Sequence, residues 1–197
     1  MLNGSPVKET DIAEEAGGRP FFKNHEADFN ISHSGGITAV SFIKGKNLRT
    51  GCDIERIRPR AGMTEIAENF FSSNEKKYFL NESKIDETKF YEIWTLKECF
   101  LKLRGLSVFD MSGVPSFISQ SLEFEFTDST PLSLRLYELT DNSNAGSANE
   151  RYMLATAAEG SNQLPEIRWF SQSSFVCKIK AEINAAPNPA QTVSPKM

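Results

Sequence analysis

The order of strand-like and helix-like segments constrains the fold of this chain most strongly. Three segments that alternate or run apolar, as strands do, come first, at 29–32, 37–43 and 49–55. Segments with helical character follow, at 63–71, 72–82 and 87–103. Strand-like segments return at 122–126, 132–139, 152–158 and 166–170. Strands, then helices, then strands again predict an α+β fold and not a regular βαβ repeat.

Local signals indicate where these elements begin and end. Ser72 and Glu75 have the spacing of a capping box, in which two side chains satisfy free N–H groups at the start of a helix. The long helix is expected to end at Gly105, because glycine readily adopts the left-handed conformation that terminates helices. The glycines of "HSGG", residues 33–36, suit a turn between the first two strands. Side chains at helical spacing on the long helix are Phe90, Ile93, Trp94, Lys97, Phe100 and Leu101.

The chain length limits the number of domains. At 197 residues the chain can form one ordinary domain, or two small related lobes that share a core, since domains commonly contain about 100 to 150 residues. We place the domain at residues 19–180. Residues 1–18 are expected to be poorly ordered, and residues 181–197, rich in Pro, Ala and small polar side chains, are typical of a flexible tail.

Charge and cysteine content exclude several classes of protein. A net charge of -4 and a pI near 5.4 provide no overall field that would attract nucleic acid or an anionic membrane. No stretch reaches the roughly 20 apolar residues of a membrane span, and the first residues lack the pattern of a signal peptide. Three cysteines without a CxxC pair indicate neither a disulfide scaffold nor a zinc cluster. We therefore expect a cytoplasmic protein without a nucleic-acid or membrane partner.

The stretch "GCDIERIRPR", residues 51–60, places two carboxylates on one face of a strand. Side chains i and i+2 of a strand point the same way, so Asp53 and Glu55 would lie close together and repel each other. A shared proton, a nearby cation or a divalent metal would relieve that repulsion. Oxygen ligands without histidine favour magnesium. The alternative is a solvated edge strand whose acids lie beside Arg56 and Arg58.

Two further stretches contain candidate site residues. "WTLKECFLKLRG", residues 94–105, places Glu98 and Lys102 one helical turn apart, which suits either a functional pair or an ordinary surface ion pair. In "FNISHSGG", Ser32 and His33 precede the glycine turn. They belong either to a simple hairpin or to a phosphate-binding turn built from hydroxyl, imidazole and backbone amides.

Four segments in this order, FNISHS, GCDIE, FFSSNE and WTLKECFLKLRG, resemble the 4'-phosphopantetheinyl transferases, in particular the larger surfactin-synthetase-activating type. The signature of that family is a Gly-x-Asp-x-Glu strand followed along the chain by Trp-Ser/Thr-x-Lys-Glu-x-x-x-Lys. The resemblance extends from about Gly18 to Phe170. It implies a transferase that moves the 4'-phosphopantetheine arm of coenzyme A to a serine of an acyl or peptidyl carrier protein and releases adenosine 3',5'-bisphosphate.

The resemblance also implies an architecture. Members of this type contain two similar α+β halves related by a pseudo-twofold axis, with coenzyme A in the cleft between them. Here only 28 residues precede Phe29, so we expect most of the first half to be missing from this sequence, either because the true start lies upstream or because the chain is a natural short form. Residues 1–18 are then expected to be poorly ordered or a remnant of that half. The protein is then expected to be a monomer or to self-associate.

Residue roles follow from the same resemblance. Asp53, Glu55 and Glu98 match the ligands of Mg²⁺, which would bridge the pyrophosphate of coenzyme A. Lys102 would lie against the same phosphates and stabilise the charge of the leaving group. The attacking serine must lose a proton, and the candidates for the base are Glu98, a metal-bound water and Glu75. Glu75 is equally well explained as the third residue of the capping box.

Other positions match residues that contact coenzyme A or the carrier. Ser32 and His33 match residues at the phosphates, and Arg19 stands where the family often has a nucleotide-proximal lysine. Phe109 and Met111 are candidates either for carrier docking or for core packing. Two alternatives to the transferase remain: a carrier-binding relative impaired by the missing first half, and a magnesium phosphohydrolase.

Overall fold

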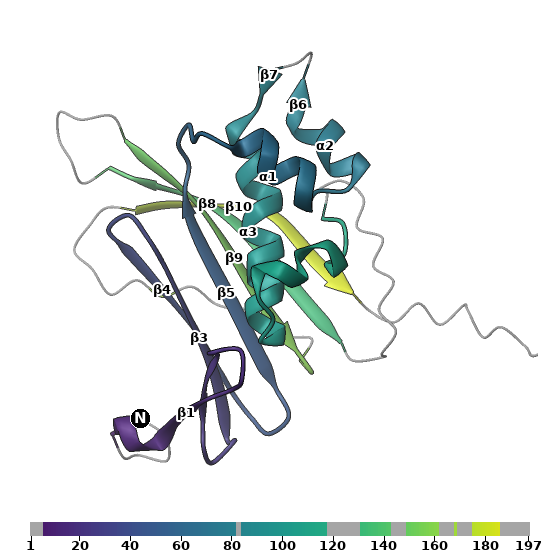
Figure 1. Cartoon of the computed structure of the whole chain (residues 1–197). Coiled ribbons are helices and arrows are strands. Elements are labelled where there is room, and N and C mark those ends of the chain that lie inside the picture. Colours follow the sequence, from purple (N-terminus) through teal and green to yellow (C-terminus); the bar gives the residue numbers. More distant parts are fainter. Residues whose placement is uncertain are drawn as a thin grey trace, which may run out of the picture.

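A four-stranded antiparallel sheet in the order β10–β8–β9–β5 forms the centre of the protein (Figure 1). The computed structural model describes residues 6–81, 84–117, 131–142, 149–161, 168 and 175–185. The sheet strands are β5 (Arg49–Arg56), β8 (Leu132–Asp141), β9 (Glu150–Glu159) and β10 (Phe175–Ala185). The predicted strands at 122–126 and 166–170 lie outside the described residues, apart from Arg168.

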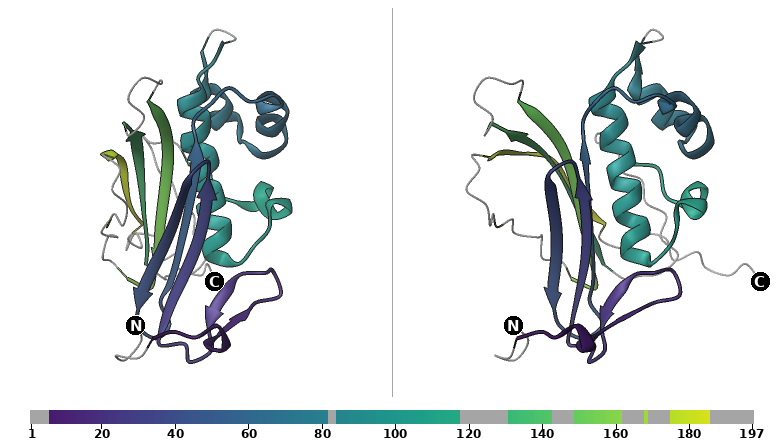
Figure 2. Two further views of the ribbon diagram at one scale, coloured as in Figure 1. Left: turned by 90° about the vertical axis from the view of Figure 1, so that its left-hand side faces the viewer. Right: turned by 60° about the vertical axis from the view of Figure 1, so that its left-hand side comes forward.

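Helices pack on one side of this sheet (Figure 2). They are α1 (Met63–Phe70), α2 (Ser73–Phe79) and α3 (Glu87–Arg104). The side chain of Asp86 caps the start of α3 by accepting from the Lys89 N–H at 3.1 Å. Gly105 ends the helix in the left-handed conformation, with φ at 68°. A block of strands, a mainly helical block and a second block of strands therefore follow one another as expected, and the α+β fold is confirmed.

The main core lies between α3 and the sheet. Phe90 and Ile93 of α3 are fully buried with Leu134 and Leu136 of β8 and Ala155 of β9. A cluster of aromatic rings then joins α1 and α2 to α3, formed by Phe71, Phe79 and Phe90. Burial of these side chains, at about 1.5 to 3 kcal/mol each, holds α3 firmly against the sheet.

A separate hairpin lies beside β5 (Figures 1 and 2). It contains β3 (Ala27–Ser34) and β4 (Ile37–Lys44), joined at the predicted glycine turn, where Gly35 has a φ of 57°. Its outer face exposes Ile31, Val40 and Phe42.

Both ends of the chain contain more regular structure than the sequence indicated. Within residues 6–18, which we expected to be poorly ordered or a remnant, a short 3-10 helix, η1 (Glu9–Asp11), precedes β1 (Ile12–Glu14). This strand pairs with β2 (Pro20–Phe22). Strand β10 continues to Ala185, beyond the start of the expected tail at residue 181. Pairing with β8, which is distant in the sequence, accounts for β10, and composition alone does not reveal such a partner.

The remaining described elements are small: β6 (Leu80–Asn81), β7 (Lys84–Ile85) and the 3-10 helix η2 (Val108–Gly113). On η2 the side chain of Met111 is buried, whereas that of Phe109 is 89% exposed. Core packing therefore explains Met111 and leaves Phe109 available to a partner. Over the described part of the chain, no helix combines the length and apolar character needed to cross a membrane.

Candidate active site

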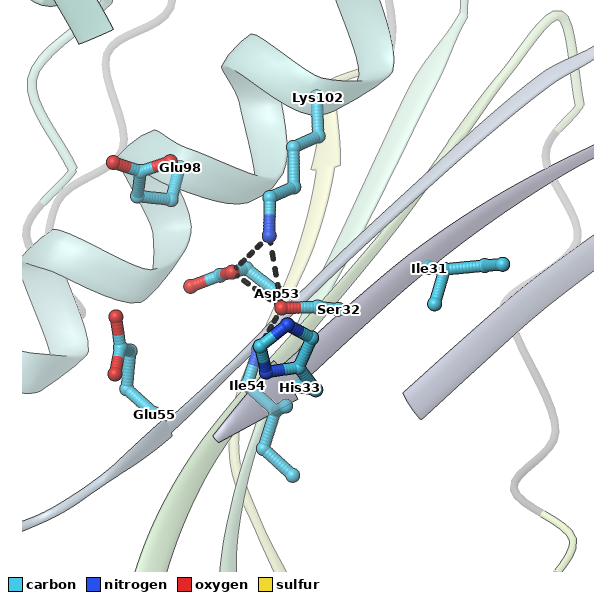
Figure 3. A pocket seen from close by; sticks show the side chains of 8 residues that line it. All are labelled: Ile31, Ser32, His33, Asp53, Ile54, Glu55, Glu98 and Lys102. Atoms are coloured by element: carbon cyan, nitrogen blue, oxygen red, sulfur yellow. Dashed lines mark hydrogen bonds and ion pairs between the residues drawn. The ribbon is translucent and has the colours of Figure 1, made fainter. Parts of the chain in front are cut away.

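A pocket of about 330 Å³ opens beside β3, β5 and α3 (Figure 3). Its lining residues are Ile31, Ser32, His33, Asp53, Ile54, Glu55, Glu98 and Lys102. Apart from the two isoleucines, all of these were selected from the sequence. Three separate sequence segments therefore meet at one site.

Local geometry explains why the charged residues meet. Alternation along β5 directs Asp53 and Glu55 to the same side, and one helical turn of α3 separates Glu98 from Lys102. The two elements approach closely at Gly51, where a Cβ atom would lie 2.7 Å from the carbonyl oxygen of Cys99. Glycine at this position therefore permits the contact that brings the strand acids to the helix.

Asp53 lies at the centre of the site and is buried. Its Oδ1 accepts from Lys102 Nζ at 2.6 Å and from the Ser32 hydroxyl at 2.8 Å. Its Oδ2 is also buried and has no hydrogen-bond partner. Burial raises the pKa of the Asp53 carboxyl, although the positive charge of Lys102 opposes that shift. One oxygen of Asp53 is therefore hydrogen-bonded within the protein, and the other is without a hydrogen-bond partner among the described residues.

Glu55 is held by two neighbours that we did not select as site residues. The Trp94 indole N–H donates to its Oε1 at 3.3 Å, and the Ser34 hydroxyl donates to its Oε2 at 3.2 Å. Burial and the nearby charge of Asp53 both raise the pKa of the Glu55 carboxyl. Ser34 could have been found from the sequence, because it follows Ser32 by two residues and so faces the same way on a strand.

The pKa values of Glu98 and Lys102 are both raised, which favours the neutral form of Glu98 and the charged form of Lys102. Burial, together with the charge of Asp53, raises the pKa of Glu98 to about 7. For Lys102, burial disfavours the charged form, but the attraction of Asp53 outweighs it and the pKa is raised. At neutral pH the pocket therefore contains a permanent cation beside a carboxyl that exchanges its proton readily.

The carboxylates suit a magnesium ion in part. Hard oxygen donors and the unpartnered Oδ2 of Asp53 are the features that Mg²⁺ requires, and this ion commonly takes only one or two protein carboxylates. Within the described ranges, no three His, Cys, Asp or Glu side chains are already arranged around one point. Asp53 and Glu55 therefore fit as ligands, and Glu98, on the facing helix, would have to turn toward them to become the third.

Arg19 does not line this pocket. Its side chain is buried, forms two hydrogen bonds with the Asp28 carboxylate, and also donates to the carbonyl oxygens of Lys102 and Thr50. These contacts fasten the end of α3 to β3 and β5. The structure thus gives Arg19 a packing and bridging role, and its contact with nucleotide stays a prediction.

Glu75 also lies away from the pocket. It forms the capping box of α2 with Ser72, accepts from the Phe117 N–H at 2.7 Å, and pairs with the buried Lys97 at 3.3 Å. Its side chain has no exposed surface. Of the two interpretations weighed for Glu75, the capping box is observed, and the residue is not positioned among the groups that could take a proton from a substrate.

Ser32 and His33 occupy different positions in the site. His33 is exposed and lines the pocket, where it can meet a ligand. The Ser32 hydroxyl points inward, donates to Asp53 and accepts from Lys102 and from the Ile54 N–H. A hydroxyl has one donor and two acceptor positions, so Ser32 has none left for a phosphate in this arrangement.

The fold and the pocket together define an α+β protein that gathers three acids and a lysine at one site. A family model described as the 4'-phosphopantetheinyl transferase superfamily matches residues 49–157, which is more than half of the 197 residues. The chain therefore belongs to the 4'-phosphopantetheinyl transferase superfamily.

Curated relatives agree with this assignment. The chain is 33% identical over 132 residues to the 4'-phosphopantetheinyl transferase AcpT of Salmonella typhimurium, covering 66% of this chain and 67% of the relative. It is 35% identical over 119 residues to the 4'-phosphopantetheinyl transferase Sfp of Bacillus subtilis, covering 58% of this chain and 51% of the relative. The chain thus matches between about half and two thirds of the length of these relatives.

Proposed function

We propose that this protein transfers the 4'-phosphopantetheine arm of coenzyme A to a serine of an acyl or peptidyl carrier protein in a Mg²⁺-dependent reaction. The observation that carries the proposal is the meeting of Asp53, Glu55, Glu98 and Lys102 in one pocket. Three of these groups are acidic, and yet a lysine is paired among them, as expected where a metal and phosphates bind together.

Each residue has a chemical task in this reaction. Asp53 and Glu55 would hold Mg²⁺, with Glu98 as the third acid. When bound, the ion would neutralise charge on the pyrophosphate. Lys102, already fixed by Asp53 at 2.6 Å, adds positive charge beside the leaving group.

In this reaction each bond that forms is matched by one that breaks, and the proton that is released has an acceptor in the pocket. The serine oxygen of the carrier forms a bond to the β-phosphorus of coenzyme A, and the bond from that phosphorus to the bridging oxygen breaks. Adenosine 3',5'-bisphosphate leaves with the bridging oxygen. Glu98 is the group that would accept the serine proton, and in the metal-free protein its pKa is about 7.

Exposed apolar side chains near the end of α3 support a carrier as the second substrate. Phe109 is 89% exposed, and Leu106 and Val108, within three residues of it in the sequence, are also exposed. Aromatic side chains of this kind often anchor protein interfaces. Charge steering of an acidic carrier would have to be local, since the net charge of the chain is -4.

A carrier-binding protein without transferase activity is the second candidate. It is favoured by one observation, namely the 89% exposed Phe109 side chain, which suits the docking of a carrier whether or not transfer follows. Such a protein would form a complex with carriers and leave them unmodified.

One experiment separates these functions. Apo carrier protein, coenzyme A and Mg²⁺ are incubated with the protein, and the intact mass of the carrier is measured. Transfer adds one phosphopantetheine group, binding gives a complex by native mass spectrometry without any mass gain, and a phosphohydrolase releases phosphate without a carrier.

Variants assign the activity to the pocket. Glu98→Gln and Asp53→Ala are expected to lower the transfer rate by about 100-fold or more, because each removes a group that acts on the reacting atoms. Glu65→Gln, at an exposed acid on α1, is the matched control and should retain full activity. Wild-type rates in both pocket variants would refute the site.

A further inference from the structure

The inner face of β3 binds the edge of β5 through side chains and not through a backbone ladder. Every second residue of β3 accepts a hydrogen bond from the backbone N–H of every second residue of β5. The pairs are Asp28 with Thr50 at 2.8 Å, Asn30 with Cys52 at 3.2 Å, Ser32 with Ile54 at 3.2 Å and Ser34 with Arg56 at 3.0 Å. We call this set the side-chain ladder.

The side-chain ladder supplies hydrogen-bond acceptors to the edge strand β5. In the four-stranded sheet β5 pairs with β9 on one side, and alternate N–H groups on its other side need acceptors. A buried N–H without a hydrogen-bond partner destabilises the folded state. Side chains with oxygen atoms at every second position of β3 supply those acceptors.

Two members of the side-chain ladder have a second partner. Ser32 accepts from the Ile54 N–H and donates to the carboxylate of Asp53 at 2.8 Å. Ser34 accepts from the Arg56 N–H and donates to the carboxylate of Glu55 at 3.2 Å. Each serine therefore forms hydrogen bonds to one acidic side chain of β5 and to the backbone N–H of the residue that follows that acid.

We propose that Ser32 and Ser34 are positioning residues that orient the carboxylates of Asp53 and Glu55 toward the pocket. The catalytic consequence of this inference rests on the proposed function. The orientation of the two carboxylates by the serines does not. A serine hydroxyl that accepts a hydrogen bond from a backbone N–H still has its own hydrogen to donate. In each serine that hydrogen is donated to one carboxylate oxygen. The other oxygen is thereby directed away from the serine.

The unpartnered oxygen of Asp53 is consistent with this role. Its Oδ1 is occupied by Ser32 and Lys102, while its Oδ2 is buried with no hydrogen bond. For Glu55, Ser34 and Trp94 each hold one oxygen, at 3.2 and 3.3 Å. Outer partners of this kind commonly change metal affinity by about 10- to 100-fold when they are removed.

Ser34 is the better residue for a test, because Ser32 also contacts Lys102. Three variants are made: Ser34→Ala, Ser34→Thr and Ser34→Val. The Thr and Val side chains have nearly the same shape, but only Thr retains the hydroxyl. Asn30→Ala is the control, since Asn30 belongs to the side-chain ladder but its partner Cys52 is not an acid.

Two measurements are made on each folded variant. The first is Mn²⁺ affinity, by titration calorimetry or electron paramagnetic resonance, with Mn²⁺ as the probe for the carboxylate site. The second needs no metal: the NMR signal of the Trp94 indole N–H, which reports its hydrogen bond to Glu55 and is assigned with a Trp169→Phe variant.

We expect Ser34→Ala and Ser34→Val to weaken Mn²⁺ binding about 10-fold and to shift the Trp94 indole signal. Ser34→Thr should restore both to near the wild-type values, and Asn30→Ala should change neither. An unchanged indole signal in both Ser34→Ala and Ser34→Val would overturn the inference. If the wild-type protein binds no Mn²⁺, the proposed metal site fails, and the indole signal alone still decides whether Ser34 positions Glu55.

Discussion

Gly51 shows how one residue without a side chain controls the geometry of the whole site. A Cβ at this position would lie 2.7 Å from the Cys99 carbonyl oxygen and 2.9 Å from the Leu103 Cβ, so the backbone of α3 would have to move. We expect Gly51→Ala to destabilise the protein by about 1 to 3 kcal/mol, the usual cost of overpacking, and to reduce transfer. Denaturant unfolding and the carrier mass assay measure the two effects.

Gly36→Ala is the matched control for that prediction. A Cβ at Gly36 meets no atom within 4 Å, and this glycine is not among those with a positive φ. Equal effects of the two substitutions would show that the close approach at Gly51 does not position the acids.

The raised pKa of Glu98 predicts that the stability of the metal-free protein depends on pH. Its folded-state pKa is about 7, above its ordinary value of 4.5, because burial disfavours the charged form. The folded state therefore binds more protons than the unfolded state between these pH values, and the contribution of Glu98 to stability declines as the pH rises from about 4.5 to 7.

The comparison of wild type with Glu98→Gln isolates this effect. With a chelator present, free energies of unfolding are measured at pH 5 and pH 8. Wild type should lose more stability than Glu98→Gln over this interval. Identical losses would mean that the pKa of Glu98 is not raised.

At the residue scale the sequence indicated which groups meet but not how they are held. Strand and helix periods predicted that Asp53 shares a face with Glu55 and that Glu98 lies one turn from Lys102. That the two pairs meet at one site was implied by the resemblance to the family. The Trp94 contact to Glu55 could not be predicted, because it depends on how α3 packs across the sheet.

At the scale of elements, Glu75 and Lys97 connect three segments of the chain. Glu75 caps α2 and accepts from the Phe117 N–H, while Lys97 of α3 is 2% exposed, has a pKa lowered by burial, and pairs with Glu75 at 3.3 Å. Glu75→Ala would leave the Lys97 ammonium buried without this partner, at a cost of about 3 to 5 kcal/mol. Thermal or denaturant unfolding measures the loss.

A double variant separates this structural role from catalysis. Glu75→Gln combined with Lys97→Met removes both charges and should be more stable than Glu75→Ala. Glu68→Ala, which breaks the more exposed pair with Lys76, should cost at most about 1 kcal/mol. If the stable double variant lost all transfer activity, Glu75 or Lys97 would have a direct catalytic role.

Elements that pack locally were predictable, and elements that depend on distant partners were not. Helices α1, α2 and α3 begin and end within a few residues of the predicted positions, because caps and periodicity are local signals. In contrast, β1 and β2 contain only three residues each, too few for a visible period, and exist by pairing with each other. Strand β10 likewise depends on β8.

At the scale of the whole molecule, the two parts that form the pocket are held by different forces. The sheet and α3 share a continuous apolar core. The hairpin exposes most of its outer face, with Val40 at 63% and Phe42 at 55% exposure, and its inner face meets β5 mainly through the polar side-chain ladder. The hairpin therefore buries less apolar surface than α3 does.

This difference predicts two levels of stability, which native-state hydrogen exchange can resolve. The amides of Thr50, Cys52, Ile54 and Arg56 donate to the side-chain ladder, so they become exposed when the hairpin separates from β5. We expect them to exchange with a lower opening free energy and a weaker denaturant dependence than the amides of the central strand β9, which require global unfolding. Asn30→Ala should accelerate exchange at Cys52 more than at the β9 amides. If the ladder amides and the β9 amides instead shared one opening free energy, the hairpin and the sheet would unfold as a single cooperative unit, and the pocket would open only when the whole protein unfolds.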